Sequence, residues 1–235
     1  MREALAAGVV LDLFGTPEAL TRHGDLALLA PEVSPVDDEA LAALTETVQP
    51  QGLVAVCEQV DVTLGDALAK RPRLVAVVAE IRDPGNAGTV LRTADAAGAG
   101  AVIFAGDAVD PYNGKCVRGS AGSLFHVDVV RTGMSVAEEL RAAGLQVLAT
   151  TGYGADDLDT LLDEGGLAGP TAWIFGSEAH GLPRDVLDAA DRRVRVPIYG
   201  GAESLNLAAA AAVCLYASAR AHRPVPTARP TGPAG

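Results

Sequence analysis

Short apolar runs alternate with helix-like stretches along the chain from residue 73 onward. The runs have the length and β-branched composition of strands, and they occupy residues 74–81, 101–104, 126–130, 146–150, 172–175 and 193–197. Between them the apolar positions follow helical spacing, and a long Ala-rich helix is expected at residues 204–221. Because apolar strands alternate with helices, the pattern predicts an α/β fold with a mostly parallel sheet covered on both faces.

The front of the chain carries a shorter version of the same alternation. Helical spacing is found at residues 2–7 and 37–48, and strand-like runs at residues 9–14 and 52–57. The pattern therefore predicts a small α/β unit. We interpret this unit as incomplete, because the chain opens inside a helix with no strand before it.

Composition excludes several classes of protein. Hydrophobic residues make up 49% and charged residues 20%, so wholesale disorder is excluded, and no apolar run reaches the length of a membrane span. The three cysteines never show CxxC spacing, which argues against a disulfide scaffold or a thiolate zinc site and for a reducing cytoplasm. The four histidines show no ligand spacing either, so we expect no metal.

The net charge of −12, taken alone, argues against a nucleic-acid partner. Its distribution changes that conclusion, because residues 1–69 hold 12 acidic and 2 basic side chains whereas residues 70–235 hold 18 and 16. The larger part of the chain can therefore present a local cationic patch. Lys70 and Lys115 are the only lysines, so nearly all positive charge is guanidinium, which suits phosphate recognition.

The first stretch with candidate chemistry is residues 80–99, where a strand ends in charged residues and turns through Pro84 and Gly85 into a helix at Asn86. Backbone N–H groups at a helix start attract anions, and Arg92 lies six residues after Asn86. An RNA phosphate is therefore a natural ligand for this stretch. The alternative is a plain turn with Asn86 as the N-cap and Arg92 on a solvated face.

The second stretch is residues 173–183, in which an apolar strand runs into a Gly-rich loop. Ligands bind at the carboxyl ends of strands in open α/β sheets. Gly176 would let a ligand approach the backbone, and Glu178 offers a carboxylate there.

The third stretch is residues 193–216, where a short strand and a Gly-Gly turn deliver Glu203, Ser204 and Asn206 to the start of the last helix. Ser204 and Asn206 are also ordinary capping residues. The small residues 208–212 permit close packing, either against a partner chain or within a core.

Together the three stretches resemble the signature motifs of the SpoU (TrmH-like) family of RNA 2′-O-ribose methyltransferases, in the SPOUT superfamily. The matching segments, in order, are RDPGNAGTVLRTADAAG, IFGSEAHGL and VPIYGGAESLNLAAAAAVCLY, and the match covers about residues 73–220. The resemblance implies a SPOUT-type sheet with a C-terminal trefoil knot, which holds S-adenosylmethionine. It also implies a homodimer with the pocket near the subunit interface.

The resemblance further implies which residues act at the site. The functional positions of the family fall on Arg92, Asn86, Glu178, Ser204 and Asn206. Cofactor contacts are implied for Gly176, Val196 and Leu205, with Thr150 and Gly152 as a weaker addition. Because a guanidinium is a weak base, we assign Arg92 to phosphate anchoring and to stabilisation of the developing alkoxide.

The resemblance also divides the chain. We expect a partial substrate-binding domain at residues 1–57, a linker at 58–72, the methyltransferase domain at 73–222 and a disordered tail at 223–235. Family members with the front domain begin it with a basic strand that has no counterpart here, so we expect translation to start upstream of Met1.

The leading functional hypothesis is methylation of rRNA. A tRNA methyltransferase, a catalytically silent knotted module that binds RNA, and a methyltransferase for a small molecule are the alternatives.

Overall fold

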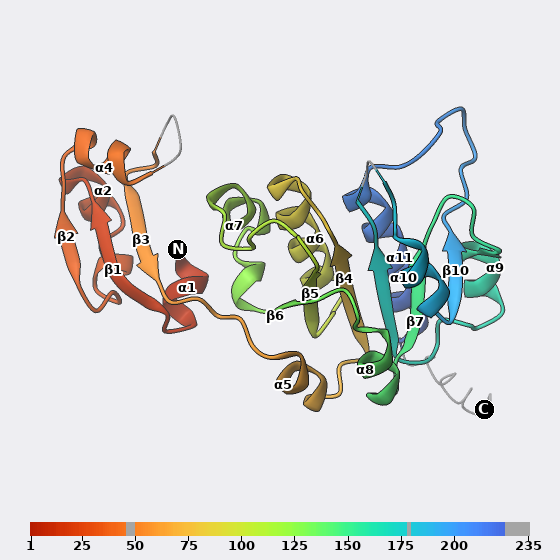
Figure 1. The fold of residues 1–235 in the computed structure, drawn as a ribbon. Coiled ribbons are helices and arrows are strands. Elements are labelled where there is room, and N and C mark those ends of the chain that lie inside the picture. The colour runs from red at the N-terminus through yellow and green to blue at the C-terminus, as the bar shows by residue number, and fades with distance from the viewer. Residues whose placement is uncertain (46–49, 178–179, 224–235) are drawn as a thin grey trace, which may run out of the picture.

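The chain folds around two β-sheets, as Figure 1 shows. The computed structural model describes residues 1–45, 50–177 and 180–223. The expected disordered tail lies outside these ranges from residue 224 onward, so that expectation stays a prediction. No helix within the described ranges has both the length and the apolar composition needed to cross a membrane.

The large sheet contains seven described strands, and all of its strand pairs are parallel. The strands are β4 (Leu74–Ala79), β5 (Ala101–Ala105), β6 (Asp128–Thr132), β7 (Gln146–Thr150), β8 (Asp156–Asp157), β9 (Thr171–Phe175) and β10 (Arg192–Arg195). Their spatial order is β6-β5-β4-β9-β7-β10-β8, with Val77 of β4 in register with Ile103 of β5 and Ile174 of β9. The expected α/β fold with a mostly parallel sheet is confirmed.

Helices cover both faces of this sheet (Figure 1). One face carries α6 (Pro84–Ala96), α7 (Gly114–Ser120), α9 (Leu158–Asp163) and α11 (Leu207–Ala221). The other face carries α5 (Leu64–Ala69), α8 (Ala137–Ala142) and α10 (Arg184–Ala189). Strand β4 shows why both faces need cover, because its successive side chains alternate between the two apolar clusters and all are buried.

The small sheet lies at the amino-terminal end of the molecule (Figure 1). Strand β1 (Val10–Gly15) pairs in parallel with β2 (Val33–Pro35) and antiparallel with β3 (Leu53–Cys57). The helices of this unit are α1 (Arg2–Ala6), α2 (Pro17–Arg22), α3 (Gly24–Ala27) and α4 (Asp38–Leu44). The Thr16 hydroxyl accepts a hydrogen bond from the Ala19 N–H and so caps α2, with Pro17 as its first residue.

The segment after the small sheet is held against the large one by polar contacts. The Val60 N–H donates to the Tyr112 hydroxyl, which in turn donates to the Asp61 carboxylate at 2.9 Å. Arg131 pairs with Asp61 at 2.8 Å, and its guanidinium lies over the Tyr112 ring. Further along, Leu64 and Ala67 of α5 are buried against the large sheet. Much of the expected linker is therefore packed onto the body of the protein.

The start of α6 differs from the expectation that Asn86 is its N-cap. Asp83 is the N-cap, and its carboxylate accepts a hydrogen bond from the Asn86 N–H at 2.9 Å. The reason is Pro84, whose fixed φ and missing N–H suit the first helical position and so shift the cap back to Asp83. The interpretation of Asn86 as an N-cap is wrong, and its side-chain oxygen instead accepts a hydrogen bond from Asn206.

Candidate active site

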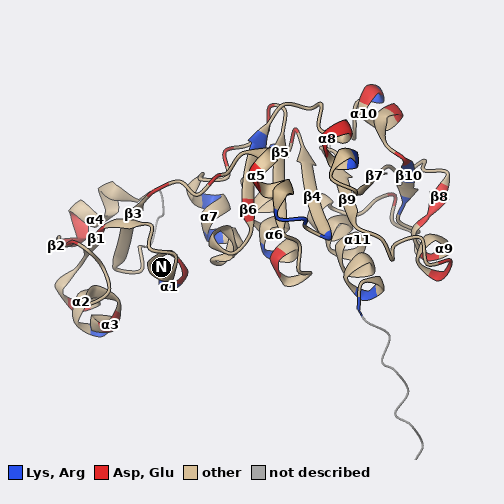
Figure 2. Ribbon diagram, turned by 90° about the horizontal axis from the view of Figure 1, so that it is seen from below, with Lys and Arg blue, Asp and Glu red and all other residues tan. Residues whose placement is uncertain are grey.

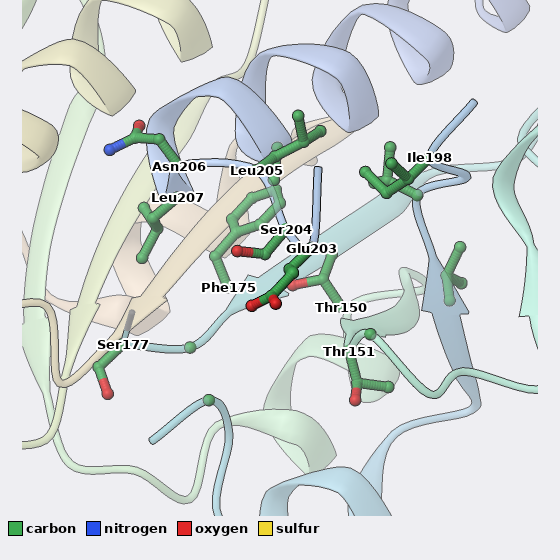
Figure 3. Close-up of a pocket in the computed structure, with 16 residues that line it drawn as sticks. Thr150, Thr151, Phe175, Ser177, Ile198, Glu203, Ser204, Leu205, Asn206 and Leu207 are labelled. Carbon is green, nitrogen blue, oxygen red and sulfur yellow. The ribbon is translucent and has the colours of Figure 1, made fainter. Parts of the chain in front are cut away.

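A pocket of about 390 Å³ opens at the carboxyl edge of the large sheet (Figure 3). Its lining comes from the ends of β7 and β9, from β10 and the loop after it, and from the start of α11. These segments meet because β7 lies between β9 and β10 in the sheet. The volume is in the range that holds a drug-sized ligand.

A tight turn after β9 forms one wall of the pocket. The Gly181 N–H donates to the Ser177 carbonyl at 2.8 Å, so the chain folds back on Gly176. A Cβ on Gly176 would lie 2.3 Å from the Gly181 carbonyl carbon, which explains why a glycine is needed there. Glu178 lies outside the described residues, so its expected role stays a prediction.

All five residues expected to contact the cofactor line this one pocket. They are Gly176, Val196, Leu205, Thr150 and Gly152. Two of the expected catalytic residues, Ser204 and Asn206, line it as well. The second and third motifs of the sequence are therefore brought together, although they are separate along the chain.

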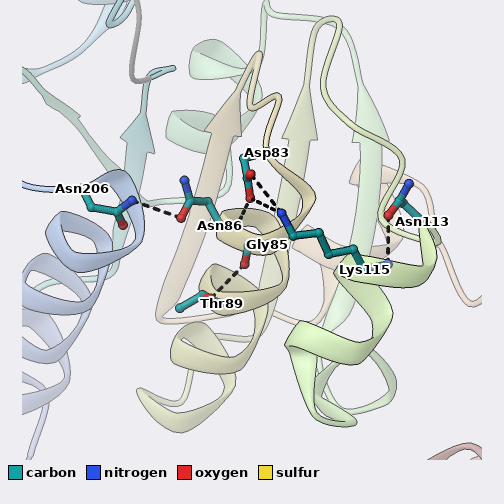
Figure 4. Close-up of polar contacts among 7 residues, drawn as sticks. All are labelled: Asp83, Gly85, Asn86, Thr89, Asn113, Lys115 and Asn206. Carbon is teal, nitrogen blue, oxygen red and sulfur yellow. Dashed lines mark hydrogen bonds and ion pairs between the residues drawn. The ribbon is translucent and has the colours of Figure 1, made fainter. Parts of the chain in front are cut away.

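The first motif reaches the pocket through a contact between two asparagines (Figure 4). The Asn206 side-chain amide donates to the Asn86 side-chain oxygen at 3.2 Å. The Asn206 oxygen also accepts from the N–H groups of Ala208 and Ala209, which makes it the N-cap of α11. Asn206 thus fixes both the start of α11 and the position of Asn86 at the pocket edge.

A lysine from α7 supports the same turn of α6 (Figure 4). The Lys115 ammonium lies 3.2 Å from the Asp83 carboxylate. The hydrogen bond from the Asn86 backbone, followed by the one from Lys115, holds the pKa of Asp83 below its ordinary value. The two helices can approach closely because Gly88 has no side chain. A Cβ there would lie 2.4 Å from the Cys116 carbonyl oxygen.

Arg92 is not brought to the pocket by its own chain. It is exposed on α6 and is absent from the pocket lining. At 100° per residue, its position is about 120° around the helix axis from Asn86. Across residues 1–45, 50–177 and 180–223, no hydrogen bond or ion pair engages its side chain.

Glu203 was placed in the third stretch from sequence but given no role, and the structure puts it in the pocket lining. It is the only charged side chain among the described residues that line this pocket. The signal in the sequence was a carboxylate directly before Ser204 in a Gly-rich loop. Elsewhere in the described part of the chain, His, Cys, Asp and Glu never gather in threes as around a metal ion.

Comparison with known proteins adds named relatives of this chain. It is 38% identical over 182 residues to the 23S rRNA (guanosine(2553)-2′-O)-methyltransferase RlmP of Bacillus subtilis. This match covers 77% of this chain and 70% of the relative. It is 33% identical over 199 residues to the 23S rRNA (guanosine-2′-O-)-methyltransferase RlmB of Ralstonia nicotianae, with 82% and 78% covered.

Solved structures show the same fold. The SpoU methyltransferase AviRb from Streptomyces viridochromogenes, in complex with the cofactor AdoMet, matches with a TM-score of 0.81 and 31% identity. The match covers 93% of this chain and 86% of AviRb. An AdoMet-bound rRNA methyltransferase from Sinorhizobium meliloti matches with a TM-score of 0.80 and 30% identity, over 94% of this chain and 85% of that one.

The family assignment rests on the segment that builds the pocket. The model of the family described as "SpoU rRNA Methylase family" matches residues 73–216. This match spans more than half of the chain and contains all three motifs and every residue of the pocket lining. The chain belongs to the SpoU rRNA methylase family.

Proposed function

We propose that this chain is an RNA 2′-O-ribose methyltransferase that takes its methyl group from S-adenosylmethionine and modifies rRNA. The observation that carries the proposal is the pocket, because residues of the second and third family motifs line one cavity together with the loop after β7. The relatives named as 23S rRNA 2′-O-methyltransferases and the AdoMet-bound neighbours support the reaction, the cofactor and the substrate class.

The pocket has the chemistry that S-adenosylmethionine needs. Val196 and Leu205 offer apolar contacts, and Thr150 and Ser204 offer hydroxyls beside them. Gly176 lets the turn after β9 pack closely and so forms part of the pocket wall. When bound, the cofactor supplies an activated methyl group, so the protein has only to position it and the acceptor.

The residues around the pocket divide the remaining work. The ribose hydroxyl must be aligned with the methyl carbon and must lose its proton as it reacts. We assign Arg92 to anchoring an RNA phosphate and stabilising the developing alkoxide, and Asn86 to orienting the ribose. Ser204 and Asn206 shape the cofactor end of the pocket, and Glu178 fixes the loop after β9.

A homodimer completes this site. Val213 and Tyr216, three positions apart on α11, are 44% and 53% exposed and so lie on one face of the helix. A second copy packed on this face would bury them and place the pocket near the interface. The second copy then supplies the Arg92 that the pocket lacks from its own chain.

The C-terminal part of the chain is threaded as a trefoil knot in this proposal. Strand β10 lies between β7 and β8, and the chain then returns from β10 to α11, which packs on α6 and β9. This late insertion between earlier strands supports the threading. Residues 73–222 form the methyltransferase domain and contain the whole of the pocket.

Residues 1–57 act in this proposal as a substrate-binding domain, joined to the methyltransferase domain by residues 58–72. Basic side chains for RNA are found on α7 of the body, where Lys115 and Arg118 are exposed (Figure 2). The presence of a separate front unit at residues 1–57 favours rRNA over tRNA as the substrate.

The test is transfer of labelled methyl from S-adenosylmethionine to unmodified rRNA and to tRNA, followed by digestion to nucleosides. We expect a 2′-O-methylated nucleoside from rRNA. A base-methylated product, or label in tRNA alone, would contradict the proposal. Cofactor binding without transfer to any RNA would instead favour a catalytically silent module or a methyltransferase for a small molecule.

A further inference from the structure

Glu203 gives the pocket a charge that no neighbouring side chain neutralises. In Figure 3 its carboxylate points into the cavity, on the side of the Ser204 and Thr150 hydroxyls. All other described residues of the lining are neutral. The cavity therefore has a negative potential set by one side chain.

The carboxylates just outside the pocket are different, because arginines pair with them. Asp157 pairs with Arg195 at 3.2 Å, and Asp156 pairs with Arg192 at 3.0 Å. Glu203 makes no such pair, and no hydrogen bond, with any residue in the described part of the chain. An anionic ligand would be repelled there, whereas a ligand with a positive centre would gain a counter-charge.

From this arrangement we infer that Glu203 determines specificity between cofactor and spent product, by offsetting the positive sulfonium of S-adenosylmethionine. The inference rests on the proposed function, which supplies the cofactor. Methyl transfer converts the sulfonium into the neutral thioether of S-adenosylhomocysteine, so the product loses the charge that Glu203 attracts. The pocket then binds the charged cofactor more tightly than the product and favours product release.

The strength of this attraction depends on how far the ligand excludes water. Glu203 is exposed in the open pocket, where water screens its charge. A ligand that fills the cavity displaces that water and strengthens the interaction. We expect removal of the charge to weaken binding of S-adenosylmethionine about 5- to 20-fold, between the values for exposed and buried charge pairs.

The test is calorimetric titration of wild type and Glu203→Gln with S-adenosylmethionine and with S-adenosylhomocysteine. We expect the 5- to 20-fold loss for the charged cofactor and less than about a twofold loss for the product, so the affinity ratio falls. Glu203→Asp keeps the charge and should retain most of the ratio. Glu164→Gln removes an exposed charge outside the pocket lining and should leave both affinities unchanged.

Several results would overturn the inference, and they are distinguishable. Equal losses for the two ligands would mean that Glu203 contacts the ammonium that both share. An unchanged affinity of Glu203→Gln for S-adenosylmethionine, with an unchanged melting temperature, would show that the charge has no effect. If the wild type binds neither ligand, the proposed function fails and the inference fails with it.

Discussion

Two of the glycines that line the pocket, Gly152 and Gly176, differ in the space around them. A Cβ on Gly176 would meet the backbone of the facing turn, with contacts of 2.3 Å and 2.5 Å to Gly181. A Cβ on Gly152 would meet nothing within 4 Å. Backbone atoms cannot move aside as the end of a flexible side chain can, so only Gly176 is sterically required.

This contrast predicts different outcomes for the same substitution. Gly176→Ala should force the turn after β9 outward, destabilise the fold by about 1–3 kcal/mol and weaken cofactor binding at least tenfold. Gly152→Ala should leave the free energy of unfolding nearly unchanged, because no protein atom lies where its Cβ would be. Urea unfolding and calorimetric titration measure the two effects, and equal behaviour of the two variants would contradict the steric account.

Arg92 tests the division of labour within the proposed reaction. Because it does not line the pocket of its own chain, Arg92→Ala should abolish methyl transfer and leave the affinity for S-adenosylmethionine nearly intact. Arg118→Ala, on the neighbouring helix α7, is the matched loss of one exposed guanidinium and should lower transfer only modestly. Methyl incorporation and calorimetry measure the two quantities. Parallel losses of transfer and cofactor affinity in Arg92→Ala would disprove the assignment.

At the scale of elements, one histidine connects α1 to the body of the protein. His126, which follows the short 3-10 helix Ser123–Phe125, lies 2.9 Å from the Glu3 carboxylate and 2.8 Å from that of Asp95. Both ring nitrogens face carboxylates, so the protonated ring is favoured. The hydrogen bond with Glu3, followed by the one with Asp95, raises the pKa of His126 above its ordinary value.

The raised pKa predicts a pH-dependent contact. The contribution of His126 to stability is fully present below about pH 6.5, its unfolded value, and is lost as the pH rises through the folded pKa. Because the three groups are partly exposed, we expect less than about 1 kcal/mol. The difference in urea midpoint between wild type and His126→Gln should therefore shrink from pH 6 to pH 9. Glu3→Gln removes one of the two carboxylates and should make this change with pH smaller. A difference in midpoint that does not depend on pH would refute the account.

The elements found from sequence are those with a strong local signal. The runs that became β4, β5 and β9 are apolar throughout. Helix α7 was missed, because its sequence GKCVRGS contains glycines and lacks helical apolar spacing. Its stability comes from close packing on α6, which is a tertiary property.

The site, like the fold, was predictable where a local sequence pattern specifies it. The loop after β9 and the loop before α11 carry recognisable motifs, so their lining residues could be named from the sequence, whereas the loop after β7 carries no such motif. The contact between Asn206 and Asn86 joins residues 120 positions apart, and no local pattern specifies it. The start of the last helix was placed at Ser204, whereas α11 begins at Leu207, because Asn206 caps it.

At the scale of the whole molecule, the proposed homodimer predicts that the exposed face of α11 is the subunit interface. Val213→Glu places a charge in the apolar face and should convert a dimer into a monomer, with loss of methyl transfer. Leu28→Glu changes an equally apolar side chain, 89% exposed on the small unit, and should leave the mass unchanged. Light scattering after size exclusion measures the mass. A monomeric wild type would contradict the dimer proposal.

The order of strands in the large sheet has a consequence for how the protein is made on the ribosome. Strand β9 joins β4 to β7, and β10 is the partner of both β7 and β8. Until β9 has left the exit tunnel, the nascent chain holds only the β6-β5-β4 strip, with β7 and β8 unpaired, and β8 stays unpaired until β10 follows. The cavity is thus completed only after residues 194–210 have emerged, and removal of this segment destroys the cavity while the strip remains.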